Sequence, residues 1–456
     1  MEQAFRRSRR PLAALVMMLA LLWPALWNGF PIVFYDTGGY LDSYMTGLLA
    51  NGRSAVYGLF LRLGIPTGFW LNIVVQAGMV TWLLVLTLRA HGFSGRPGLA
   101  VAIALGLAAF TSLPWYAAQL MPDVWLPAGV LAFYLLAFRS NAMRRWEEIV
   151  LGAVIAFAIA GHMATLALMV GLLAALALWR VLAPWWHWLR PTLGLPTVAV
   201  AAGILLILIG NFTITGRFTF IPGGTNFLFG RLIQTGIAAR YLTDQCPDSS
   251  LRVCAYRDTL PTDGDYWLWS EESPLWKMGG WEGFADEARR IVIDSIRKYP
   301  ALHSRAAFDG ALSQLFMLKS GDYITPWTWH THGILKKYAP AWYPTFLAAR
   351  QQQAEFDFTW VNAVHVPVAA AAMAGLLIAL LLTRRSHVRR SAAAFAPMVL
   401  VALVGNALVC GVLSNPHDRY QSRLIWLAPL VLVIAAGGRR SSIMLQDRPY
   451  FRRKPD

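Results

Sequence analysis

Two aspartates, Asp36 and Asp42, lie in the segment YDTGGYLDSY, residues 35–44, directly after an apolar run. A turn or a helix cap would explain Asp36 by itself, because aspartate accepts hydrogen bonds from free backbone N–H groups. Neither role requires the neighbouring glycines and tyrosines. We therefore predict that Asp36, rather than Asp42, is a catalytic base, and that Tyr35 and Tyr40 contact a substrate.

Two arginines, Arg419 and Arg423, lie in SNPHDRYQSR, residues 414–423, before the last apolar run. They are four residues apart, so a helix places them on one face. Two guanidiniums on one face can hold a phosphate or pyrophosphate bidentately. Snorkelling towards lipid headgroups is one alternative. The other alternative is an ion pair between each arginine and a nearby aspartate. The candidates are Asp36, Asp123 and Asp418. We also predict that His417 and Tyr420 contact the substrate.

Asp123 and His162 lie in turns between apolar runs. Asp123, in QLMPDVWLP, is either the N-cap of the helix that follows or a carboxylate that orients the substrate. His162 is either a polar turn residue or a substrate contact. His330 and His332, in WTWHTHG, would form half of a metal site on an extended strand, but no carboxylate lies close in sequence. We therefore predict that no cofactor is required, although a divalent metal is compatible with the site.

The composition is that of a membrane protein. Of the 456 residues, 57% are hydrophobic and 14% are charged, whereas a soluble domain carries about a quarter charged residues. Apolar runs of about twenty residues recur, which is enough to cross a hydrocarbon core of about 30 Å. The net charge of +16 comes largely from arginines between these runs. This pattern indicates orientation in a lipid bilayer and not nucleic-acid binding.

We predict an all-α integral membrane protein of about ten transmembrane helices, the first an uncleaved anchor. The spans fall near residues 11–29, 67–89, 98–116, 123–138, 147–160, 163–182, 194–213, 361–383, 391–413 and 424–438. Groups of arginines occupy every second turn between spans: Arg89 and Arg96; Arg139, Arg144 and Arg145; Arg180 and Arg190; Arg384, Arg385, Arg389 and Arg390. Because arginine and lysine accumulate on the cytoplasmic side, both termini are predicted to be cytoplasmic.

This orientation divides the chain into three parts. Residues 1–213 form an N-terminal membrane domain with an external loop at 30–66, and residues 361–456 form a C-terminal membrane region with a basic tail. Between spans 7 and 8, residues 214–360 form a mostly helical extracytoplasmic segment. Apolar residues at three- and four-residue spacing predict two amphipathic helices in that segment, separated by Pro300.

Two cysteines, Cys246 and Cys254, lie eight positions apart in the predicted external segment, whereas Cys410 lies in a span. Neighbouring cysteines in an oxidising compartment usually pair. No histidine lies nearby to complete a zinc site. We therefore predict a disulfide.

These motifs resemble the GT-C superfamily of membrane glycosyltransferases. YDTGGYL is similar to the first external loop of that family, Asp123 matches the acidic residue of its next external loop, and DRYQSRLIWLAPL is similar to its late Arg-Tyr before a final span. The chain departs from many relatives in having Thr37 after Asp36, where they carry glutamate, and in placing its long external segment before the last three spans.

The resemblance implies that a sugar moves from a polyprenyl-phosphate donor to a cell-envelope acceptor, which is a glycan, a lipid or a protein. Transfer would occur at the outer face of the inner (plasma) membrane. Asp36 would act as the base, Asp123 would orient the substrate, and Arg419 with Arg423 would bind the phosphate. Two other functions stay open. A transporter or flippase of a lipid-linked glycan would show repeat symmetry between its halves, and we find no internal repeat. A non-catalytic membrane protein of envelope assembly is the third possibility.

Overall fold

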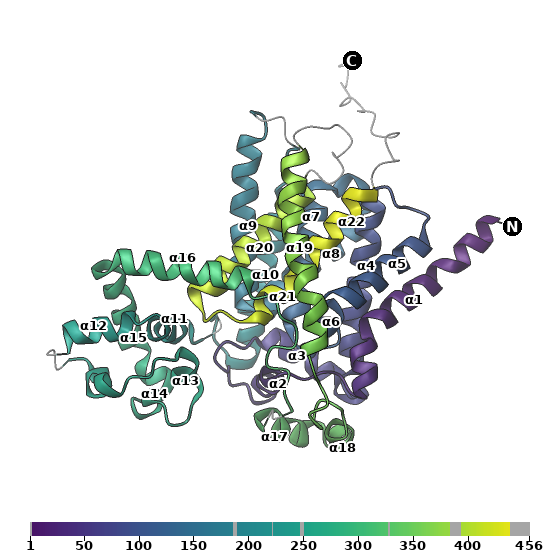
Figure 1. Cartoon of the computed structure of the whole chain (residues 1–456). Coiled ribbons are helices and arrows are strands. Elements are labelled where there is room, and N and C mark those ends of the chain that lie inside the picture. The colour runs from purple at the N-terminus through teal and green to yellow at the C-terminus, as the bar shows by residue number, and fades with distance from the viewer. Residues whose placement is uncertain are drawn as a thin grey trace, which may run out of the picture.

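The computed structural model describes residues 2–185, 189–220, 222–246, 250–326, 329–383 and 394–437. Its named elements are all helices, as the composition predicts, and the single isolated β-bridge among the described residues joins Ile32 to Gln119. A bundle of long helices occupies the upper part of Figure 1, and shorter helices lie below it and to its left.

Seven helical segments within the described residues are long and apolar enough to cross a membrane. They are Arg10–Asn28 of α1 (Glu2–Asn28), α4 (Trp70–Ala90), α9 (Met163–Leu182), α10 (Gly194–Thr215), Thr359–Leu381 of α19 (Thr359–Thr383), α20 (Phe395–Leu413), and Asp418–Gly437, which joins α21 (Asp418–Ile425) to α22 (Leu427–Gly437). The chain is therefore a multi-pass, all-helical membrane protein.

Three other predicted spans form shorter helices: α5 (Pro97–Phe110), α7 (Trp125–Phe138) and α8 (Arg145–Gly161). At 14, 14 and 17 residues, they extend about 21–26 Å at 1.5 Å per residue, less than a hydrocarbon core of about 30 Å. The span predicted over 98–116 is interrupted because the backbone is extended at Thr111, and α6 (Leu113–Ala117) begins after it. By length and apolar character, seven of the ten predicted spans thus qualify among the described residues.

Side-chain bonds join several of the loops between the long helices. The Ser54 hydroxyl donates to the Ala160 carbonyl, Gln314 donates to the His417 carbonyl at 2.8 Å, and Arg89 pairs with Glu147 at 2.7 Å. The arginines predicted to be cytoplasmic at 384–390 lie outside the described residues.

Residues 214–358 contain two parts. The first comprises α11 (Gly224–Gln234), α12 (Ile237–Gln245), η4 (Arg252–Thr259), α13 (Gly264–Trp269), α14 (Pro274–Lys277) and α15 (Gly280–Lys298). These helices share a core in which the rings of Phe229, Trp267 and Phe284 lie 4.9–5.5 Å apart. The second comprises α17 (Trp329–Tyr338), η5 (Pro340–Trp342) and α18 (Tyr343–Leu347), whose apolar residues belong to the core of the membrane bundle. Figure 1 shows the first part to the left and the second below α2.

The helix α16 (Pro300–Phe316) connects the first part to α20. Pro300 is its first residue, and α15 ends at Lys298, so the predicted division between two helices at Pro300 is confirmed. Proline suits this position because the first helical residue does not need its N–H for an intrahelical bond.

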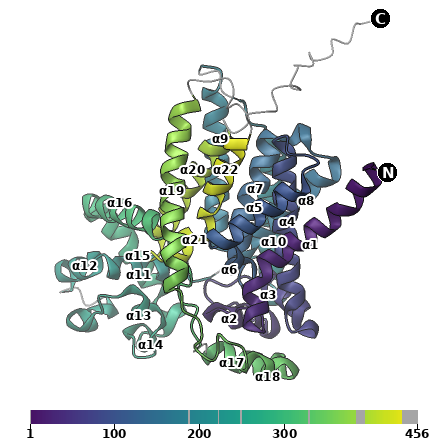
Figure 2. The same ribbon diagram turned by 45° about the vertical axis from the view of Figure 1, so that its right-hand side comes forward.

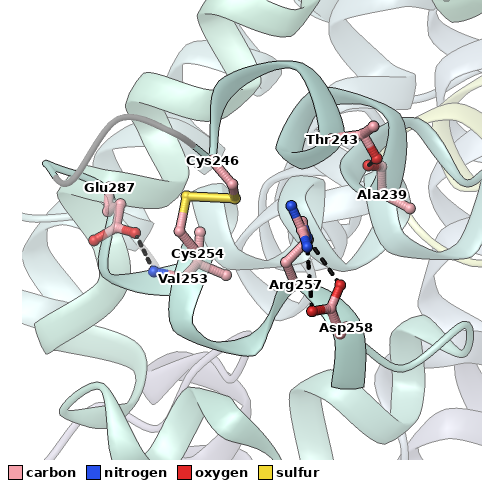
Figure 3. Close-up of a disulfide and its surroundings, with 8 residues drawn as sticks. All are labelled: Ala239, Thr243, Cys246, Val253, Cys254, Arg257, Asp258 and Glu287. Atoms are coloured by element: carbon pink, nitrogen blue, oxygen red, sulfur yellow. Dashed lines mark hydrogen bonds and ion pairs between the residues drawn. A yellow bond between two sulfur atoms is a disulfide. The ribbon is translucent and has the colours of Figure 1, made fainter.

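Cys246 and Cys254 are bonded to each other in the structure, with Cα atoms 5.1 Å apart. Figure 3 shows the bridge between the end of α12 and η4. Next to it, the Val253 N–H donates to the Glu287 carboxylate of α15 at 2.8 Å. The bridge and this hydrogen bond tie η4 to the helices on either side of it.

The remaining helices surround the candidate site or link the spans. They are α2 (Tyr35–Thr46), α3 (Ala55–Gly64), η1 (Ile65–Thr67), η2 (Pro122–Val124) and η3 (Ser140–Ala142).

Candidate functional site

Asp36 is the second residue of α2 and does not cap that helix. The cap is made by Thr37, whose hydroxyl accepts a hydrogen bond from the Phe34 N–H at 2.8 Å and donates to the Leu120 carbonyl at 3.0 Å. Asp36 still lies in the first turn, where the helix dipole favours a negative charge. Its side chain is therefore free to contact other groups.

Two arginines hold the Asp36 carboxylate. Arg53, from the loop before α3, donates to Oδ1, and Nη2 of Arg419 lies 3.6 Å from Oδ2. The side chains of Asp36, Arg53 and Arg419 are 11%, 12% and 10% exposed. Each of the three thus keeps limited access to solvent or to a ligand.

Asp123 forms a second ion pair with Arg423, at 2.9 Å. No described cap involves the Asp123 side chain, so the capping role that the sequence allowed is not present. The two side chains are 2% and 1% exposed. Arg423 also donates to Asn406 at 3.4 Å and to the Cys410 sulfur at 3.7 Å. Of the three alternatives for Arg423, the geometry favours the ion pair over phosphate binding and snorkelling, because the guanidinium is enclosed by protein.

Arg419 and Arg423 lie one turn apart in α21, as their spacing predicts. The Tyr420 ring lies between them, with its centroid 5.0 Å and 5.2 Å from the two guanidinium carbons. The Phe34 ring contacts Arg419 from another direction at 4.3 Å. Cation–π contacts of this kind favour a charged guanidinium and help to fix its orientation.

A small pocket, with room for about one water molecule, lies beside Arg419. Arg419 supplies a cation, and its Nε is buried without a hydrogen-bond partner in the described structure. Asp322 lies in the same wall and accepts a hydrogen bond from the Arg419 backbone N–H at 3.2 Å. The other lining residues are mostly apolar or aromatic: Phe34, Trp115, Tyr116, Gln119, Gly321 and Ile324.

His417 links the membrane bundle to the first part of residues 214–358. Its Nε2 lies 3.1 Å from an Asp265 carboxylate oxygen, and Asn415 donates to the other oxygen at 2.9 Å. Burial raises the pKa of Asp265, but the hydrogen bond and charge of His417, together with the Asn415 hydrogen bond and the charge of Arg419, hold that pKa below its usual range. His417 therefore positions α13 against the start of α21.

His162 and Tyr40, both predicted to contact the substrate, have structural roles, and so does Asp42. The His162 ring accepts a hydrogen bond from the Ala164 N–H at 3.1 Å and so caps α9. Tyr40 is 1% exposed and packs edge-on against Tyr57 at 5.1 Å, so its ring is not free to stack on a ligand. Asp42 accepts a hydrogen bond from the Tyr338 hydroxyl at 3.1 Å, away from both ion pairs.

Tyr35 stacks on His330 of α17, with ring centroids 5.8 Å apart. Burial lowers the pKa of His330, which favours the neutral ring. His332 contacts Gln352 at 3.2 Å. In the part of the chain that the structure describes, no group of three or more histidine, cysteine, aspartate or glutamate side chains could hold a metal ion.

Sequence reasoning missed Arg53, Asp322 and Asn406. Arg53 carries a signal that was available, because an arginine in a predicted external loop runs against the tendency of arginines to be cytoplasmic. Asp322 and Asn406 carry no comparable signal, since nothing in their local sequence distinguishes them.

The structure thus brings Asp36, Asp123, Arg419 and Arg423 together, with Arg53 beside Asp36. The buried Tyr40 ring borders this group, 5.9 Å from the guanidinium carbon of Arg53, whereas Asp42 bonds to Tyr338 instead. Comparison of the chain with protein-family models, with curated proteins and with solved structures gave no match.

Proposed function

We propose that this protein is a membrane glycosyltransferase that moves a sugar from a polyprenyl-phosphate donor to a cell-envelope acceptor. The observation that supports this proposal is the contact of Asp36 with Arg419 beside a pocket. A carboxylate next to a cation suits a reaction in which a hydroxyl loses a proton and a phosphate departs. In the proposed orientation, about ten spans cross the inner membrane, both termini are cytoplasmic, and residues 214–360 are extracytoplasmic.

In the proposed reaction, Asp36 accepts the proton of the acceptor hydroxyl while that oxygen bonds to the anomeric carbon of the sugar. The bond between this carbon and the phosphate oxygen breaks, and the polyprenyl phosphate leaves with additional negative charge. Arg419 and Arg53 neutralise this charge. A phosphate that takes over Arg419 would also release one oxygen of Asp36 for the proton.

The two arginines that contact Asp36 suit phosphate binding better than Arg423 does. Their side chains are 10% and 12% exposed, whereas that of Arg423 is 1% exposed and already paired. Asp123 and Arg423 then act as positioning residues, because their ion pair holds η2 beside α21. The proposed phosphate clamp is therefore Arg53 with Arg419.

The test is a lipid analysis by mass spectrometry of membranes from cells with and without the gene. A polyprenyl-phosphate sugar should accumulate when the protein is absent, and its level should return to normal with the wild-type chain but not with Asp36→Asn. Unchanged lipid-linked sugars in the deletion strain would contradict the proposal. Normal levels restored by Asp36→Asn would favour transport or assembly over catalysis.

The proposed orientation has a separate test. A reporter that is active only in the cytoplasm should be inactive when fused near Gly264. A membrane-impermeant thiol reagent applied to intact cells should label Cys246 and Cys254 only after reduction. An active reporter at Gly264 would place the segment on the other side of the membrane.

A further inference from the structure

The helix α16 exposes large apolar side chains although it lies outside the membrane-spanning bundle. Phe308, Leu312 and Phe316 follow one another at four-residue spacing and are 66%, 46% and 61% exposed. This spacing places the three on one face of the helix. Ile293 and Ile296 of the preceding α15 are also exposed, at 42% and 49%. Exposed apolar patches on a folded protein usually mark an interaction site.

The direction of α16 restricts what can cover this face. In both Figure 1 and Figure 2, α16 runs roughly at a right angle to α19, which extends along the bundle. It crosses α20 where Gly310 meets Gly411, and the backbones approach closely there because neither residue has a Cβ atom. Gly411 lies two residues before Leu413, the last residue of α20. The crossing is thus at the end of a span, at the depth of lipid headgroups.

The exposed apolar surface of α16 lies next to that of the spans. Leu408 and Leu413 of α20 flank the crossing and are 49% and 47% exposed. In a membrane-embedded protein, side chains of this kind on a span face lipid. The lipid that covers α20 can therefore extend without interruption onto α16.

We propose that α16 is an in-plane interfacial helix whose face containing Phe308, Leu312 and Phe316 inserts into the lipid surface at the end of the bundle that holds the candidate site. Arg305 and Asp309 are exposed on the same helix and lie 3.6 Å apart. At an interface, the long arginine side chain can keep its charge among the headgroups while its stem lies along apolar surface.

This placement ties the membrane surface to the candidate site. Gln314 of α16 holds the His417 backbone through two hydrogen bonds, at 2.8 Å and 3.0 Å. Beyond the end of α16, the Lys319 N–H donates to the Asp418 carboxylate at 2.8 Å, and Asp322 lines the pocket. An interfacial α16 therefore holds one wall of the pocket at headgroup depth, whatever reaction occurs there.

Spin-label accessibility in liposomes tests the proposal on the full-length chain. Cys410→Ala removes the free thiol, and Phe308→Cys and Leu312→Cys are labelled separately. Leu408→Cys on α20 is the lipid-facing control. Lys277→Cys is the water-facing control, because Lys277 is exposed and α14 lies away from α16 in both views. The labels on α16 should report a depth of about 5–10 Å into the boundary between headgroups and acyl chains.

High accessibility to oxygen and low accessibility to a water-soluble nickel complex, as at Leu408, would support the proposal. Accessibility to the nickel complex like that at Lys277 would overturn it and show that α16 faces water. Low accessibility to both reagents would also overturn it and show that another protein surface covers the helix. Two labelled positions keep the test valid if one variant folds poorly.

Discussion

The two acid–arginine groups of the candidate site differ in how far protein encloses them. Asp123 and Arg423 are 2% and 1% exposed, and Arg423 has further partners in Asn406 and Cys410. Asp36 and its two arginines are 10–12% exposed, and Arg419 lines a pocket. The same chemical groups thus occur in a closed position and in an open one, about one turn of α21 apart.

The difference in exposure suggests different roles for the two groups. The enclosed ion pair is shielded from solvent, so removing one partner leaves a buried charge without compensation. An open carboxylate between two cations can exchange one of them for a ligand. In the proposed function, Asp123 with Arg423 therefore positions the site, and Asp36 with Arg53 and Arg419 takes part in the reaction.

The largest expected effect is the loss of the closed pair. Arg423→Ala or Asp123→Ala should lower the free energy of unfolding by roughly 3–5 kcal/mol, the cost of an uncompensated buried charge. Thermal unfolding of the purified protein in detergent measures this loss. The double replacement Asp123→Leu with Arg423→Met should lose less than either single change, because it removes both charges. A fully stable Arg423→Ala variant would show that the pair is not enclosed as described.

The next effect concerns the open carboxylate. Asp36→Asn keeps the shape of the side chain and removes its basicity, so turnover should fall by about 100-fold or more, as for a lost general base, at normal expression. Asp42→Asn is the matched control from the same helix, since Asp42 contacts Tyr338 and not the arginines. The measurement is the level of polyprenyl-phosphate sugar in complemented cells. An inactive Asp42→Asn beside an active Asp36→Asn would reverse our assignment of the two carboxylates.

Replacing the open arginine should have a smaller effect. Arg419→Lys keeps the charge but loses the planar fork, so binding of a synthetic polyprenyl phosphate should weaken by roughly tenfold, near the lower end of the free energy of a charge-assisted hydrogen bond. Arg419→Ala should weaken it further. Titration of the lipid against the detergent-solubilised protein checks both variants. Equal binding by the wild type and both variants would place the phosphate elsewhere.

The smallest effect involves His417 and Asp265, which lie beside the open group. Because the folded protein holds the pKa of Asp265 below 3.8, this contact stabilises the docking of α13 above that pH. The stabilisation is lost as the pH falls through the lowered pKa. Asp265 is 35% exposed in its side chain, so the contribution is screened and amounts to about 0.5–1 kcal/mol. Hydrogen exchange of α13 between pH 3 and pH 6 should reveal it, and Asp265→Asn should remove that part of the pH dependence.

Local sequence determined the features that depend on neighbouring residues. Apolar runs are sufficient to predict a multi-pass helical protein, because a backbone in lipid must satisfy its own hydrogen bonds. Pro300 is sufficient to divide α15 from α16, and a spacing of four is sufficient to place Arg419 and Arg423 on one side of a helix. The group of candidate residues could be predicted in part for the same reason, since charged residues at the ends of apolar runs are rare.

Only the tertiary structure decided which partners these residues have. Arg423 pairs with Asp123, 300 positions away, and this contact encloses the arginine that the sequence assigned to phosphate binding. Arg53 reached Asp36 only because the loop before α3 folds back over α2. Thr37 took the capping role that Asp36 could have had, and Tyr40 turned into the core. Periodicity and capping preference specify the face of a helix, but the packing of helices far apart in sequence decides what each face meets.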